Sequence, residues 1–129
     1  MTSKTIISTE NAPAAIGPYP QATQFGDLLF TSGQIPLEPK SMEIVAGGIT
    51  EQTEQVMQNL LAVLKEAGAS TDTVIKTTCF IKNMNDFVAF NEVYAKYFTG
   101  QAPSRSCVEV ARLPKDVLVE VEAIAYVTK

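Results

Sequence analysis

Residues 103–125 read Pro103-Ser104-Arg105-Ser106-Cys107-Val108-Glu109-Val110-Ala111-Arg112-Leu113-Pro114-Lys115-Asp116-Val117-Leu118-Val119-Glu120-Val121-Glu122-Ala123-Ile124-Ala125. Polar and apolar residues alternate in both halves of this stretch, as they do in half-buried β-strands. Residues 113–116 have the composition of a turn. The stretch therefore predicts two antiparallel strands joined as a hairpin.

The predicted hairpin carries charged side chains that could form a binding site. Arg105, Cys107 and Glu109 share one face of the first strand, while Glu120 and Glu122 share one face of the second. Arg105 is one of only two arginines in the chain. A guanidinium can bind a carboxylate through two parallel hydrogen bonds, and a nearby glutamate can move a proton on a water. The alternative is a cross-strand salt bridge on a solvent-exposed face, and the spacing leaves both interpretations open.

Periodicity and turn residues predict the other elements. We expect strands at residues 5–8, 22–25, 28–33, 43–46 and 73–82, with a stiff loop at 11–20 and a Gly26-Asp27 hairpin turn. A helix should begin at Thr50 as N-cap and end at Gly68. A second helix, capped by residues 83–86, should run to about residue 98. The sequence thus predicts a single α+β domain spanning 1–129, with two helices on one face of a mixed sheet.

Composition narrows the possible functions. The chain has 129 residues, 46% of them hydrophobic, with a net charge of −4 and a pI near 4.8. This acidity argues against a nucleic-acid partner, which requires a basic patch. The first residues do not resemble a signal peptide, and no apolar run approaches the roughly 20 residues of a membrane span. Two cysteines, Cys79 and Cys107, do not make a disulfide framework, so we expect a reducing, cytoplasmic location and no membrane partner.

Several kinds of catalytic site are missing from the sequence. The chain has no histidine, which excludes Ser-His-Asp and Cys-His nucleophile systems within it. It has neither a CxxC motif nor a histidine ligand, so we expect no metal. It also lacks glycine-rich phosphate-binding loops, so no nucleotide cofactor is expected. The chemistry is left to arginine, glutamate, tyrosine, serine, cysteine and backbone groups.

Four segments of the chain together resemble one known family. Residues 103–114 followed by 119–123 are similar to the C-terminal signature of the Rid family, the reactive-intermediate deaminases also called the YjgF family. The upstream matches are Asn11-Ala12-Pro13-Ala14-Ala15-Ile16-Gly17-Pro18-Tyr19, Thr31-Ser32-Gly33-Gln34-Ile35-Pro36 and Asn85-Asp86-Phe87. These motifs appear in the family order and cover essentially the whole chain. They most resemble the RidA branch, the 2-iminobutanoate/2-iminopropanoate deaminases.

The resemblance implies a fold, an assembly and an activity. Rid proteins have a chorismate-mutase-like fold and form homotrimers with active sites in clefts between subunits. They hydrolyse imines and enamines released by pyridoxal-phosphate enzymes, such as serine/threonine dehydratases, to 2-oxo acids and ammonia. They use no cofactor or metal. By resemblance, the partners of this chain are small 2-imino and 2-oxo acids and its own copies.

The resemblance also implies roles for individual residues. Arg105 would clamp the substrate carboxylate, Glu120 would position the hydrolytic water, and Tyr19 would close the cleft. Other pocket residues by the same match are Ser32, Gly33, Asn91 and Cys107. A nucleophilic role for Cys107 is disfavoured because it has no histidine partner. Segment 97–103 is shorter than in bacterial relatives, which affects the pocket rim and hence substrate preference.

Three other functions compete with imine hydrolysis. The first is a non-enzymatic sensor that binds small carboxylates through the same Arg105. The second is the ribonuclease or translation-inhibitor activity reported for some relatives, against which the acidic charge and absent histidine count. The third is holdase activity, which the sequence does not address.

Overall fold

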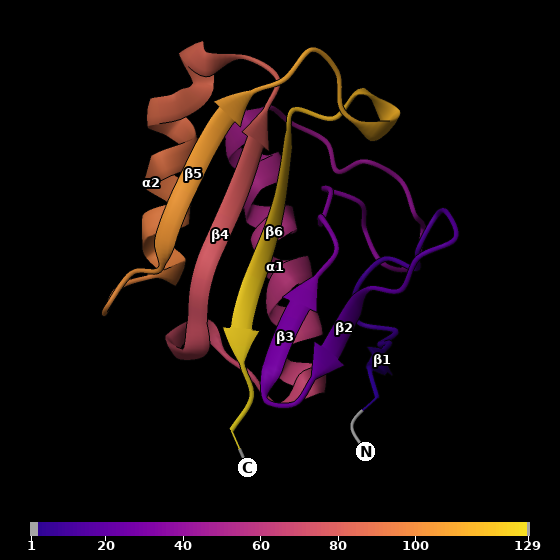
Figure 1. Cartoon of the computed structure of the whole chain (residues 1–129). Coiled ribbons are helices and arrows are strands. Elements are labelled where there is room, and N and C mark those ends of the chain that lie inside the picture. The colour runs from indigo at the N-terminus through magenta and orange to yellow at the C-terminus, as the bar shows by residue number, and fades with distance from the viewer. Residues whose placement is uncertain (1–2, 129) are drawn as a thin grey trace.

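The computed structural model describes residues 3–128. Its order is β1, β2, β3, α1, β4, α2, β5, β6, and it forms one sheet with the spatial order β1-β2-β3-β6-β4-β5 (Figure 1). The strands are β1 (Thr5–Ile7), β2 (Ala22–Phe25), β3 (Leu28–Thr31), β4 (Val74–Ile81), β5 (Ser104–Glu109) and β6 (Val119–Tyr126). The helices are α1 (Ile49–Ala67) and α2 (Phe87–Tyr97), with short 3-10 turns at Thr71–Thr73, Met84–Asp86 and Pro114–Asp116.

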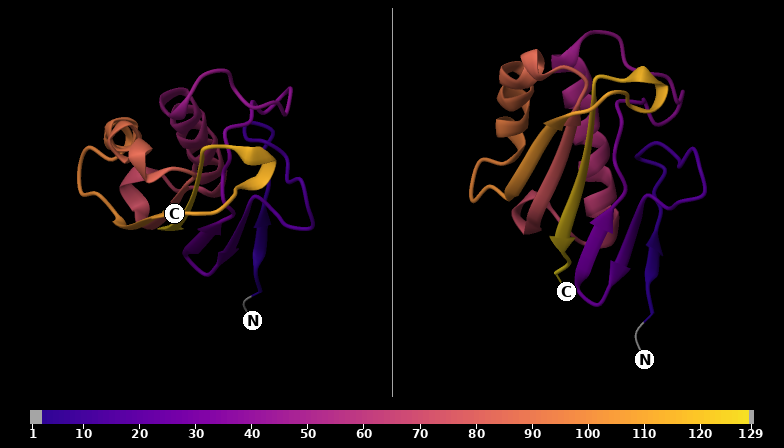
Figure 2. Two further views of the ribbon diagram at one scale, coloured as in Figure 1. Left: turned by 90° about the horizontal axis from the view of Figure 1, so that it is seen from above. Right: turned by 45° about the horizontal axis from the view of Figure 1, so that its top comes forward.

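Both long helices cover the same face of the sheet, as Figure 2 shows from above. The sheet is mixed, because β4 and β5 are parallel while the other neighbouring strands are antiparallel. This architecture confirms the predicted α+β fold with helices on one face. Neither helix within residues 3–128 combines the length and hydrophobicity that a membrane span requires.

The core lies between the sheet and α1, because strand side chains alternate between two faces. Every second residue of β6 faces α1 and is almost fully buried, while the residues between them are partly exposed. The helix contributes buried apolar residues at helical spacing, which form the face that packs on the sheet. The central core residues are Leu29, Val56, Leu60, Val63, Leu64, Cys79, Ile81, Val119, Val121, Ala123 and Ala125.

Within residues 3–128, the opposite face of the sheet has no long helix over it and carries exposed apolar side chains (Figure 2). Phe30 and Leu28 of β3 are 43% and 42% exposed, and Val108 of β5 is 43% exposed. The β6 residue Tyr126 pairs with Leu28 and is 40% exposed. Exposed apolar side chains on a sheet face are typical of a contact with another protein surface. We refer to this sheet face as the open face.

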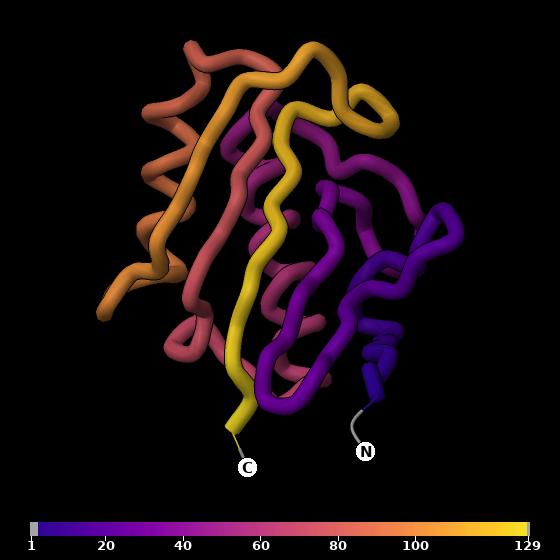
Figure 3. Tube along the Cα trace, in the orientation of Figure 1, coloured from indigo at the N-terminus to yellow at the C-terminus, as the bar shows by residue number. Residues whose placement is uncertain are grey.

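The predicted hairpin of residues 103–125 is wrong. β5 and β6 are not neighbours, because β4 lies between them and pairs with both. Residues 110–118 form a long connection that carries the chain across the end of β4, as Figure 3 shows. Leu113 and Val117 of this connection are buried against Ile35 and Leu37, which holds it in place. β4, α2 and β5 form a β-α-β unit, whose crossover helix allows parallel pairing.

Local predictions had mixed outcomes. The β2–β3 hairpin and its Gly26 turn are confirmed, as is the helix end at Gly68, whose φ of 87° is left-handed. The N-cap at Thr50 is wrong, because Gly48 occupies that position and donates its N–H to Glu51 Oε1 at 2.8 Å. The strand predicted at 43–46 is also wrong, since Ile44 makes only an isolated bridge.

Candidate active site

The guanidinium of Arg105 lies in an enclosure formed by α2. Arg105 is half-buried on the helix-covered face of β5, and its Nη1 donates to Asn91 Oδ1 at 2.7 Å. Its Cζ atom is 5.5 Å from the ring centroid of Phe87, 5.9 Å from that of Phe90 and 4.9 Å from that of Tyr94. These α2 residues share one helix face because they are three, four and seven positions apart. The aromatic rings can stabilise the cation while leaving hydrogen-bond donors unused.

Arg105 has no carboxylate partner among residues 3–128. The ion pairs of that region are Lys96–Glu54 and Arg112–Asp116. A guanidinium has five N–H donors in a planar fork, and only the bond to Asn91 is made here. A half-buried, unpaired arginine of this kind is suited to bind a small anion, above all a carboxylate.

Two cysteines lie beside the arginine. Cys107 of β5 faces Cys79 of β4 across the parallel pairing, on the same sheet face as Arg105. Burial raises the pKa of Cys107, although the Arg105 charge opposes this, and burial raises the pKa of Cys79 to about 12. Both thiols are therefore protonated near neutral pH, which disfavours a nucleophilic role. Together, Arg105, Asn91, Cys107 and the three rings make up what we call the arginine half-site.

Glu120 lies on the open face of the sheet and not beside Arg105. It pairs with Phe80 of β4, whereas Arg105 pairs with Thr77, and these positions point to opposite faces. Burial raises the pKa of the Glu120 carboxyl, and the neighbouring Glu122 raises it further. A carboxylate with a raised pKa accepts and returns a proton more readily than an ordinary one.

Gly33 allows Glu120 to occupy this position. The backbones of Gln34 and Val121 exchange two hydrogen bonds, of 2.8 and 3.1 Å, which brings residues 32–34 alongside β6. A Cβ atom on Gly33 would lie only 2.3 Å from Glu120 Oε2. Only glycine therefore fits here without moving the carboxylate.

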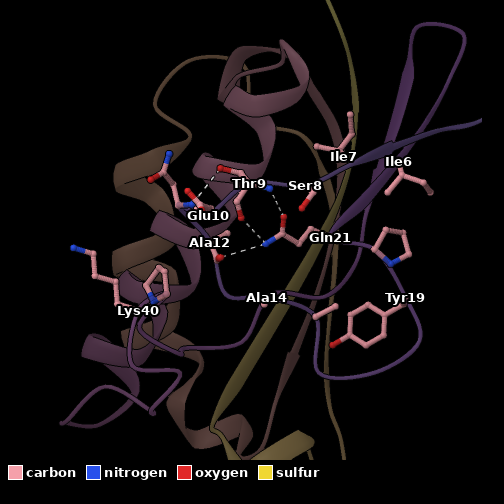
Figure 4. Close-up of a pocket in the computed structure, with 14 residues that line it drawn as sticks. Ile6, Ile7, Ser8, Thr9, Glu10, Ala12, Ala14, Tyr19, Gln21 and Lys40 are labelled. Atoms are coloured by element: carbon pink, nitrogen blue, oxygen red, sulfur yellow. Dashed lines mark hydrogen bonds between the residues drawn. The ribbon is translucent and has the colours of Figure 1, made fainter.

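The amide of Gln21 holds the loop of residues 11–20 against the sheet. Its Nε2 donates to the carbonyl of Ala12 at 3.2 Å, and its Oε1 accepts the Thr9 N–H at 2.7 Å (Figure 4). The same Nε2 also donates to the Pro13 carbonyl at 2.8 Å. A surface hollow of about 730 Å³ beside this loop is lined by Thr9, Ala12 and Gln21 among others. Neither Arg105 nor Glu120 lines this hollow, although Tyr19 does.

Two more predicted pocket residues, Ser32 and Tyr19, lie near Gly33, the residue against which Glu120 packs. The Ser32 hydroxyl donates to the Pro20 carbonyl at 2.7 Å, and the Ser32 N–H donates to the Gln21 carbonyl at 2.9 Å. Tyr19 is 42% exposed and lines one narrow cleft together with Gly33. We call Tyr19, Ser32, Gly33 and Glu120 the glutamate half-site.

The structure therefore brings the predicted residues together in two groups. The sequence-based expectation that one hairpin would place Arg105 near Glu120 is wrong within a single chain, because β4 separates their strands and their side chains leave opposite faces. Sequence reasoning also missed the aromatic enclosure, because aromatic residues at helical spacing usually belong to the core. The signal was present in the spacing of Phe87, Asn91 and Tyr94 on the helix that directly precedes the arginine strand. No group of three or more His, Cys, Asp or Glu side chains in residues 3–128 is arranged to hold a metal ion.

Comparison with known proteins decides the family. The family model described as Endoribonuclease L-PSP matches residues 9–127, nearly the whole chain and both half-sites. The chain belongs to this family, the Rid family. It is 58% identical to a RutC family protein of Pyrococcus horikoshii, covering 95% of this chain and 98% of that one. It is 51% identical to the 2-iminobutanoate/2-iminopropanoate deaminase of Escherichia coli K12, covering 95% and 97%.

Other members of the Rid family carry different names. A Lactococcus lactis protein with a regulator name, AldR, is 57% identical over 95% of this chain and 97% of its own. The crystal structure of Escherichia coli TdcF with bound serine superposes with a TM-score of 0.91 at 47% identity, covering 96% of this chain and 99% of that one. The fold is therefore that of YjgF-type proteins, while membership alone does not choose between the named activities.

Proposed function

We propose that this protein hydrolyses 2-imino acids and their enamine tautomers, such as 2-iminopropanoate and 2-iminobutanoate, to 2-oxo acids and ammonia. The observation that carries this proposal is the unpaired guanidinium of Arg105 in its aromatic enclosure. A relative of 51% identity carries the corresponding deaminase name. A cytoplasmic location, where pyridoxal-phosphate enzymes release such imines, accords with this proposal.

The proposed reaction needs only groups that the chain supplies. Arg105 holds the substrate carboxylate. Glu120 removes a proton from a water molecule while the oxygen of that water forms a bond to C2 of the iminium. The C=N electron pair moves to nitrogen and gives a carbinolamine. Glu120 then returns the proton to nitrogen, the C–N bond breaks, and the hydroxyl proton leaves with ammonia as ammonium. No covalent nucleophile is required, because the iminium carbon is already electrophilic.

This mechanism requires two copies of the chain at each site. Arg105 and Glu120 leave opposite faces of the sheet, so one chain cannot present both to one small substrate. The open face carries exposed Leu28, Phe30 and Val108, which would be buried by a second copy. We infer a homotrimer in which the arginine half-site of one subunit meets the glutamate half-site of the next.

The activity is tested by coupling the protein to a serine/threonine dehydratase and measuring release of 2-oxo acid and ammonia. The Arg105→Ala variant should no longer accelerate the release of 2-oxo acid and ammonia, whereas the Arg112→Ala variant should accelerate it as the wild type does. Arg112 is the matched control, because it is the other arginine and forms an exposed ion pair with Asp116. Loss of activity in both variants, or in neither, would contradict the assignment of Arg105.

Subunit mixing tests the shared site. Arg105→Ala and Glu120→Gln chains, each inactive alone, are unfolded together at equal concentrations and refolded. If each site takes one residue from each of two neighbouring subunits, about a quarter of the sites regain both residues. A mixture as inactive as its parents, although fully assembled, would refute the inter-subunit site.

Binding without turnover is the second candidate. A structural relative is described with bound serine, and another relative carries a regulator name. A small-carboxylate sensor would bind 2-oxo acids through Arg105 but release no ammonia in the coupled assay.

A further inference from the structure

A buried hydrogen bond lies directly beside the candidate anion site. The hydroxyl oxygens of Thr77 and Tyr94 are 2.7 Å apart, and these residues are 0% and 7% exposed. Thr77 of β4 is the direct pairing partner of Arg105 on β5. The bond therefore links the strand next to Arg105 with the helix that covers it.

The ring of Tyr94 is held in place on several sides. Its centroid is 5.7 Å from that of Phe90 on α2 and 4.7 Å from that of Phe98 just beyond α2, so these two rings restrict its movement. Its hydroxyl is fixed by Thr77. The ring is also the nearest of the three aromatic rings to the guanidinium, at 4.9 Å from Arg105 Cζ.

The tyrosine supports the cation without neutralising it. Burial raises the pKa of Tyr94, so the phenol remains protonated and adds no negative charge beside Arg105. A carboxylate in this place would occupy the guanidinium and compete with a ligand. A neutral ring leaves the remaining N–H donors available.

We propose that Tyr94, fixed by Thr77, is a positioning residue that sets the orientation of the Arg105 guanidinium for carboxylate binding. Of the three rings around the guanidinium, that of Tyr94 is the nearest, and the bond from Nη1 to Asn91 fixes the group from another atom. The proposal rests on the proposed function, because it assigns Arg105 the substrate carboxylate. A residue that served only the core would affect stability and not the discrimination between charged and neutral ligands.

The test measures preference for a carboxylate and does not depend on turnover. Calorimetry gives the dissociation constants of 2-oxobutanoate and of its neutral amide. The constant of the amide divided by that of 2-oxobutanoate is the preference ratio, and a ratio above 1 reports the contribution of the carboxylate contact. Tyr94→Phe keeps the ring but removes the hydroxyl, and Thr77→Val removes its partner. Each should reduce the ratio about tenfold, and the double variant should resemble the single variants because one bond is lost in all three.

Tyr97→Phe is the matched control. Tyr97 is on the same helix, and its hydroxyl donates to Glu54 at 2.7 Å and accepts from Gln58 at 2.9 Å, away from Arg105. This variant should lose stability without changing the ratio. Thr77→Ser retains the hydroxyl and should preserve the ratio, which keeps the proposal testable if Thr77→Val does not fold.

The outcomes separate this inference from the proposed function. A ratio unchanged in both Tyr94→Phe and Thr77→Val, with lowered stability, would overturn the positioning role. A reduced ratio in Tyr97→Phe of equal size would also overturn it. If the wild type shows the expected ratio but releases no ammonia, the deaminase proposal fails while the positioning role stands.

Discussion

Replacing Gly33 with alanine should disable catalysis while leaving the fold in place. The added Cβ would lie 2.3 Å from Glu120 Oε2, 2.7 Å from Cδ and 2.8 Å from Cγ, whereas ordinary contact begins at 3.4 Å. The carboxylate must therefore move by about 1 Å, and a displacement of that size at a reacting group can lower a rate about 10²-fold. Because the obstacle is a side chain and not backbone, the loss of folding free energy should stay near the lower end of the ~1–3 kcal/mol typical of overpacking.

The assay combines kcat in the coupled deaminase reaction with the unfolding free energy from denaturant titration. Gly100→Ala is the control, because a Cβ there would meet no atom within 4 Å. In the double variant Gly33→Ala/Glu120→Ala the clash disappears, so stability should recover while turnover does not. A Gly33→Ala protein with wild-type kcat would refute the placement of Glu120 against Gly33 as a requirement for catalysis.

Three further predictions concern the half-sites and the loop. Arg105→Lys should raise KM about tenfold or more, because an ammonium lacks the planar fork; an unchanged KM in steady-state kinetics would contradict bidentate binding. The pKa of Glu120 lies above its usual 4.5, so kcat/KM should fall as pH drops through that raised pKa, and Glu122→Gln should move this acidic limb to lower pH by removing a neighbouring negative charge. A pH–rate profile identical in wild type and Glu122→Gln would count against this coupling. Gln21→Leu should lower the unfolding free energy by about 1–3 kcal/mol, because buried backbone groups of the 11–20 loop lose their partner; an unchanged denaturation midpoint would contradict that role.

Local patterns in the sequence determined much of this molecule. Alternation and helical spacing are set by residues close together in the chain, so they predicted β2, β3, β4, both helices and the left-handed end at Gly68. The scarcity of arginine and the family-like motifs pointed to Arg105 and Glu120, and the family itself is confirmed over residues 9–127.

Only the tertiary structure decided how the strands and half-sites are arranged. Period-two alternation shows which residues of one strand share a face. It does not show which strand lies next to that strand, or which faces of the two strands lie on the same side of the sheet. The buried side chains of β4 and β6 pack together under α1, so β4 inserts between β5 and β6. That insertion separates Arg105 from Glu120 and brings Arg105 under the rings of α2. These contacts depend on long-range packing, and so the division of the site into two halves could not be read from spacing along the chain.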